Sequence, residues 1–127
     1  MGEKKKYDLE DRLVDFAVNI IHITDGLLST KAGIHIGGQV VRSGTSPALQ
    51  YGEAQSAESR NDFIHKLKIL LKELRETRVA LKIIKEAKLT NDIKEIDKIF
   101  IECNELISIF VKSIETAKKN NIKAENK

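Results

Sequence analysis

Residues 63–84 read FIHKLKILLKELRETRVALKII, and this stretch decides the fold class. Its apolar positions, with one threonine among them, recur in alternating steps of three and four. They are Phe63, Leu67, Leu70, Leu74, Thr77, Leu81 and Ile84. Steps of this size keep side chains on one face of an α-helix. The stretch therefore predicts an amphipathic helix with one face for a shared core.

Two other stretches have the same periodicity. One contains Leu9, Leu13, Phe16, Ile20, Ile23 and Leu27, and the other contains Ile93, Ile96, Phe100, Cys103, Ile107, Phe110 and Ile114. Short connections make consecutive helices antiparallel neighbours. We predict an all-α fold, an antiparallel up-down four-helix bundle, in a single domain over residues 1–127. The expected helices cover about 8–28, 31–57, 59–88 and 92–119, and residues 1–6 and 120–127 are expected to be disordered.

The segment 31–57 has weak helix propensity, because it contains Pro47 and five glycines, Gly33, Gly37, Gly38, Gly44 and Gly52. Small residues recur four apart at Gly44, Ala48 and Gly52, and at Gly33 and Gly37, which lets another helix approach closely. One long helix bent near Pro47 is our first interpretation, because proline removes a backbone hydrogen bond. Two shorter helices joined near residues 43–47 are the alternative.

Helix starts are marked by capping residues. Ser29 or Thr30 can cap the second helix, Ser59-Arg60-Asn61-Asp62 resembles a capping box for the third, and Thr90-Asn91-Asp92 precedes the fourth.

Composition limits the setting of the protein. The net charge is only +3, there is one cysteine, and no apolar run approaches the ~20 residues that span a bilayer. The first residues contain no apolar signal core. We therefore expect a cytoplasmic chain that does not contact a membrane. Cys103 lies within an apolar face, so a buried thiol is expected rather than a disulfide or a nucleophile.

The charge is unevenly distributed, since residues 58–89 carry nine basic and five acidic side chains, while residues 8–27 are mainly acidic. One sector of the third helix gathers the candidate nucleic-acid-binding residues Lys68, Lys72, Arg75, Arg78, Lys82 and Lys85. Such a face can follow a phosphate backbone. The alternative is a solvated, salt-bridged face, because Glu76 and Glu86 lie nearby and no aromatic residues are interleaved for base stacking.

Arg42 is the only basic residue between Lys31 and Arg60, and its neighbours are mostly small or apolar. We expect it to be partly buried, and a buried guanidinium needs a carboxylate. The candidate partners in a structural ion pair are Glu53, Glu73 and Glu76.

The third and fourth helices carry more apolar residues than one core face needs. Ile69, Val79 and Ile83 on the third helix are surplus, as are Ile99, Ile101, Leu106, Ile109 and Val111 on the fourth. Surplus apolar faces mark interfaces, and two different faces allow a cyclic homo-oligomer. The alternative is that a wide core absorbs these residues, or that they lie singly in solvent. We predict an oligomer interface that includes Ile99, Ile101, Leu106 and Ile109.

No catalytic or metal-binding pattern is found. His22, His35 and His65 lie on three different predicted helices, and no glutamate has a histidine three residues later, as di-iron bundles require. Gly37-Gly38-Gln39 lacks the lysine of a phosphate-binding loop, and Ser43, Thr45 and Ser46 have no adjacent base. We predict no enzyme, no metal and no cofactor.

Two stretches resemble a known family. Residues 38–46, GQVVRSGTS, continued by Tyr51-Gly52-Glu53-Ala54, are similar to the second helix of the 23S ribosomal-RNA intervening-sequence proteins. Residues 59–69, SRNDFIHKLKI, and 72–77, KELRET, are similar to its third helix. The resemblance covers nearly the whole chain.

This resemblance implies a bacterial four-helix bundle that assembles as a cyclic pentamer. The family is similar to the accessory variability protein of diversity-generating retroelements, a basic pentamer that binds nucleic acid. Two functions follow as hypotheses. The first is a non-enzymatic homo-oligomer that binds RNA or DNA through phosphates. The second is a protein–protein interaction scaffold without nucleic-acid binding.

Overall fold

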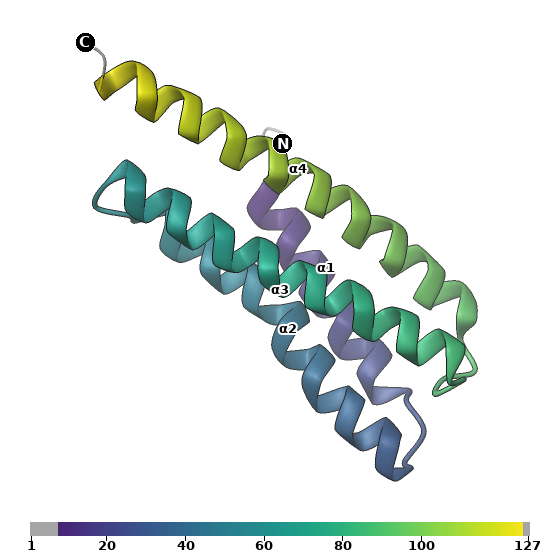
Figure 1. Cartoon of the computed structure of the whole chain (residues 1–127). Helices are drawn as coiled ribbons and strands as arrows, with labels where there is room; N and C mark the ends of the chain where they lie inside the picture. Colours follow the sequence, from purple (N-terminus) through teal and green to yellow (C-terminus); the bar gives the residue numbers. More distant parts are fainter. Residues whose placement is uncertain (1–7, 126–127) are drawn as a thin grey trace, which may run out of the picture.

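The computed structural model describes residues 8–125, which form four α-helices joined by short loops. The helices are α1 (Leu9–Asp25), α2 (Lys31–Gln55), α3 (Arg60–Glu86) and α4 (Ile93–Glu125). Each helix packs against the next along the chain, and α1 also contacts α4 (Figure 1). The predicted all-α up-down bundle is confirmed. Of the segments expected to be disordered, residues 1–6 and 126–127 lie outside the described residues, and residues 120–125 are part of α4.

All four helices begin with the same local hydrogen bond, in which a side-chain oxygen accepts from the backbone N–H three residues later. The cap residues are Asp8, Thr30, Ser59 and Asp92, with donor–acceptor distances of 3.0–3.2 Å. This bond satisfies one of the free N–H groups in the first turn. The capping predicted for Thr30, Ser59 and Asp92 is confirmed.

The core contains the apolar faces predicted for the first, third and fourth helices, but the buried face of α4 is wider than predicted. Ile99 is 2% exposed and Leu106 is fully buried. Ile99 lies beside Phe16 of α1, because α4 packs against α1 as well as α3 and so buries a wider face. The prediction that Ile99 and Leu106 belong to an oligomer interface is wrong, since both are already covered within the chain.

α2 is a single continuous helix with Pro47 inside it, so the two-helix alternative is wrong. Three of its glycines face the α1 side. A Cβ atom at Gly44 would lie 2.8 Å from Ile20, one at Gly33 would lie 1.9 Å from the Leu28 carbonyl oxygen, and one at Gly37 would lie 3.3 Å from Thr24. The predicted close approach of another helix is therefore confirmed at Gly44 and Gly37, whereas Gly33 meets the loop between α1 and α2. Gly52 has open space instead, so the proposed row of small residues does not extend that far.

Among the described residues, no helix is both long enough and apolar enough to cross a membrane.

Candidate nucleic-acid interface

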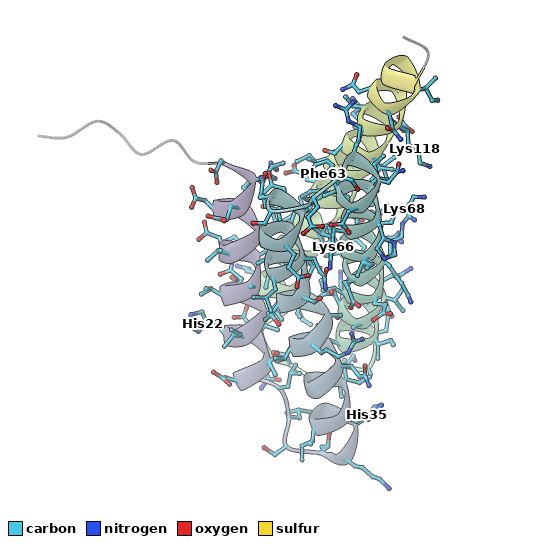
Figure 2. All side chains as sticks on the ribbon, turned by 90° about the vertical axis from the view of Figure 1, so that its left-hand side faces the viewer. His22, His35, Phe63, Lys66, Lys68 and Lys118 are labelled. Atoms are coloured by element: carbon cyan, nitrogen blue, oxygen red, sulfur yellow. The ribbon has the colours of Figure 1, made fainter. Side chains whose placement is uncertain are left out.

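The outer surface of α3 carries a straight row of three cationic side chains. Lys68, Arg75 and Lys82 are spaced by seven residues, which is nearly two full turns, so they lie along one side of the helix about 10 Å apart. We call these three residues the basic row. All three are exposed, and Figure 2 shows Lys68 projecting from the outside of the bundle.

The other three predicted binding residues lie beside the basic row in different environments. Lys72 is exposed. Arg78 is half-buried, and its guanidinium carbon lies 5.7 Å from the centroid of the Phe100 ring. Lys85 donates a hydrogen bond of 2.8 Å to Asp97 of α4, which raises the pKa of Lys85.

Ion pairing divides the predicted set. Within residues 8–125, the side chains of Lys68, Lys72, Arg75 and Lys82 form no salt bridge, whereas Lys85 is neutralised by Asp97. The interpretation of this face as wholly salt-bridged therefore applies to Lys85 and not to these four. Four unneutralised cations on one helix surface make the local electrostatic potential positive.

A groove runs between α2 and α3 next to the basic row. Its volume is about 850 Å³, and we call it the α2–α3 groove. Lys68, Lys72 and Arg75 line it together with apolar side chains, among them Val79 and Ile83, which are 52% and 42% exposed. The surplus apolar positions on the third helix therefore remain uncovered within this chain.

Arg42 joins α2 to α3 across this groove. Its guanidinium donates to Glu73 at 2.9 Å and to Glu76 at 2.6 Å, and these bonds raise the pKa of Arg42. Glu53 instead accepts from Lys66 at 3.3 Å. The Arg42 side chain is 54% exposed, so it is only partly covered, and its partners are Glu76 and Glu73 but not Glu53.

An aromatic side chain from α4 reaches the basic face of α3. Phe100 lies against Arg78 and lines a pocket with Lys82 and Lys85. No aromatic residue is interleaved among the cations in the sequence of α3, but the fold brings Phe100 of α4 beside them. The sequence of α3 alone does not predict this contact, because Phe100 belongs to α4. The signal available in the sequence was its position in the apolar face of the fourth helix.

Apolar residues are also exposed on the outside of the bundle. Val14, Val18 and Ile21 form an outer face of α1 and are 46%, 42% and 43% exposed. Of the predicted interface residues on α4, Ile101 is 60% exposed and Ile109 is half-buried.

The buried polar side chains Ser43, Thr77 and Cys103 contact each other or the backbone, whereas the buried Oε1 atom of Gln50 has no hydrogen-bond partner within the described residues. Thr77 donates to Ser43 at 2.8 Å, and Cys103 donates to the Leu74 carbonyl oxygen at 3.3 Å. Burial raises the pKa of the Cys103 thiol to about 12, so the thiolate that a nucleophile requires does not form at neutral pH.

The histidines are dispersed. His22 lies on α1 and His35 on α2, well apart in Figure 2, and His65 lies on α3. In residues 8–125, no group of three or more His, Cys, Asp or Glu side chains is arranged to hold a metal ion.

Comparison with known proteins identifies relatives by sequence and by structure. The family model described as 23S rRNA-intervening sequence protein matches residues 5–112. A crystal structure of a protein with unknown function from the S23 ribosomal protein family of Bacteroides thetaiotaomicron superposes with a TM-score of 0.75. It is 31% identical and covers 84% of this chain and 98% of its own. A search of curated proteins finds no match.

Proposed function

Because the chain belongs to the 23S rRNA-intervening sequence protein family, whose function is unknown, we propose from its own surface that it is a non-enzymatic bundle that binds RNA or DNA through phosphates. The observation that carries this proposal is the basic row, Lys68, Arg75 and Lys82, exposed and free of salt bridges within residues 8–125. Lys72 adds a fourth free cation beside it.

The spacing of the basic row favours a backbone over a small anion. Its members are about 10 Å apart, so one phosphate cannot reach two of them, while a chain of phosphates can meet each in turn. Lysine and arginine contacts to phosphates release counterions and carry no base information. Binding through the row alone is therefore salt-sensitive and weakly selective for sequence.

Charge reversal on this face tests the proposal. We expect the double variant Lys72→Glu, Arg75→Glu to bind a labelled RNA at least about tenfold more weakly than the wild type at low salt, because two attractive contacts become repulsive. Fluorescence anisotropy gives the dissociation constants.

The matched control is Lys94→Glu, Lys112→Glu, which makes the same change in net charge at two exposed positions on α4. The control is expected to stay within about threefold of the wild type, since non-local charges are screened. An equal loss of RNA affinity in both double variants would show that only the net charge matters. Unchanged RNA affinity in the α3 variant would show that this face of α3 does not bind RNA.

Exposed apolar residues support a second candidate, a protein-interaction scaffold that associates with copies of itself. The outer face of α1 presents Val14, Val18 and Ile21, and α4 presents Ile101. Helix faces of this kind are normally covered by a partner. The resemblance described above implies a closed ring of five copies, in which each copy contributes two different faces.

Sedimentation equilibrium tests this candidate. The wild type is expected to form a discrete oligomer, and Val18→Asp or Ile101→Asp is expected to dissociate it, because either change places a charge in an apolar contact. The variant that dissociates the oligomer identifies the face. A wild type that stays monomeric at high micromolar concentration would exclude self-association.

A further inference from the structure

A small pocket lies between α3 and α4, at the end of the basic row. Its apolar lining is the half-buried Phe100, with Leu81 and Ile96, which are 0% and 1% exposed, behind it, and its volume is about 210 Å³. We call it the Phe100 pocket. This volume is roughly that of seven water molecules, which suits one planar ring system and is too small for a helix.

Two lysines and two carboxylates line this pocket, and one lysine and one carboxylate of the four are paired. Lys82 and Lys85 line it together with Glu86 and Asp97, and Asp97 accepts the hydrogen bond from Lys85. Two carboxylates beside apolar walls make this pocket unfavourable for a phosphate. Apolar walls with polar groups placed around them favour a neutral ring with hydrogen-bonding edges.

We infer that the Phe100 pocket takes one unpaired nucleobase, so that the protein prefers single-stranded segments of nucleic acid over duplexes. This inference rests on the proposed function, because the basic row must hold the phosphates. Lys82 belongs to both the row and the pocket, so a strand that follows Lys68, Arg75 and Lys82 arrives at the pocket directly.

The aromatic ring supplies the contact that a phosphate-binding surface lacks. Bases stack on aromatic side chains in single-strand binders, and this contact tolerates any base because every base has a π-face. Arg78 lies over the Phe100 ring at 5.7 Å, which restrains the ring by a cation–π contact. In a duplex the bases are stacked on one another, so a base can enter the pocket only if it is first unstacked and unpaired, which costs free energy.

The experiment compares three labelled ligands of the same sequence and a length of roughly 12 nucleotides. They are a single strand containing all four bases, its duplex, and a strand of equal length in which the central bases are replaced by abasic sites. The abasic strand keeps every phosphate and loses only the bases. Dissociation constants are measured by fluorescence anisotropy at one fixed salt concentration.

The protein variants isolate the ring. Phe100→Leu keeps an apolar side chain of similar size at the pocket and removes the aromatic face. Phe63→Leu is the matched control, because Phe63 is also half-buried but lies near the start of α3, about 27 Å along the helix from Leu81. Circular dichroism melting of each variant confirms that the bundle is folded.

We expect the wild type and Phe63→Leu to bind the base-containing strand about tenfold or more tightly than the abasic strand and the duplex. Phe100→Leu is expected to lose this preference while keeping its affinity for the abasic strand.

Two other outcomes separate the claims. If Phe100→Leu retains the wild-type preference for the base-containing strand, or the wild type has no such preference, the pocket assignment is wrong. The proposed phosphate contacts would still stand in that case if Lys72→Glu, Arg75→Glu abolishes binding. If no ligand binds even at low salt, the proposed function is wrong and the inference falls with it.

Discussion

Replacing Phe110 by alanine is expected to lower the free energy of unfolding by about 3–5 kcal/mol. Phe110 of α4 is fully buried, and its ring meets Tyr51 of α2 edge to face, with centroids 5.8 Å apart. These rings join two helices that are not neighbours in the bundle. Truncation removes both the apolar burial and the ring contact and leaves a cavity that the surrounding helices fill only in part.

Leu49→Ala is the control for this prediction, since Leu49 is on α2, the helix that carries Tyr51, but is 71% exposed. Its effect is expected to be within about 0.5 kcal/mol. Urea-induced unfolding followed by circular dichroism measures both variants. A loss below about 1 kcal/mol for Phe110→Ala would contradict the position given to this ring in the core.

Gly44→Leu is expected to lower the free energy of unfolding by about 3 kcal/mol, the upper end of the usual penalty for overpacking. A Cβ atom at Gly44 would lie 2.8 Å from both Cγ atoms of Ile20, and Ile20 is fully buried and β-branched. The isoleucine cannot rotate away into solvent, so α1 and α2 must separate.

Gly52→Leu provides the opposite result from the same substitution on the same helix. Gly52 is exposed, and a Cβ atom there meets no atom within 4 Å. Removing a glycine from a helix interior is expected to raise the free energy of unfolding by somewhat less than about 1 kcal/mol. If thermal unfolding shows that the melting temperatures of the two variants shift in the same direction, α1 and α2 do not pack closely at Gly44.

The fold was predictable because its signals are local. A helix face is encoded by spacing within one segment, as at Leu67, Leu74 and Leu81, and a cap is encoded by one residue such as Ser59. The continuity of α2 was harder to predict. Its interior Pro47 disfavours a helix, whereas the packing of its glycines against α1 stabilises one.

The site was less predictable because it depends on how helices are rotated relative to one another. Ile99 and Leu106 flank the apolar face predicted for the fourth helix. The spacing of residues alone does not show whether a flanking side chain contacts α1 or solvent. Phe100 joins the basic face of α3 for the same reason. Arg42 forms ion pairs with Glu73 and Glu76, two of the carboxylates predicted from charge. Its side chain is long enough to extend beyond the contact between α2 and α3, so it is half exposed.

The proposed binding of phosphates by α3 is tested by the salt dependence of nucleic-acid binding. The observed association constant of the wild type for a single-stranded RNA is measured between roughly 50 and 200 mM salt. Four free cations, Lys68, Lys72, Arg75 and Lys82, predict a slope of about −3 in a plot of log K against log salt concentration. A slope near zero, or no binding at the lowest salt concentration, would contradict the account.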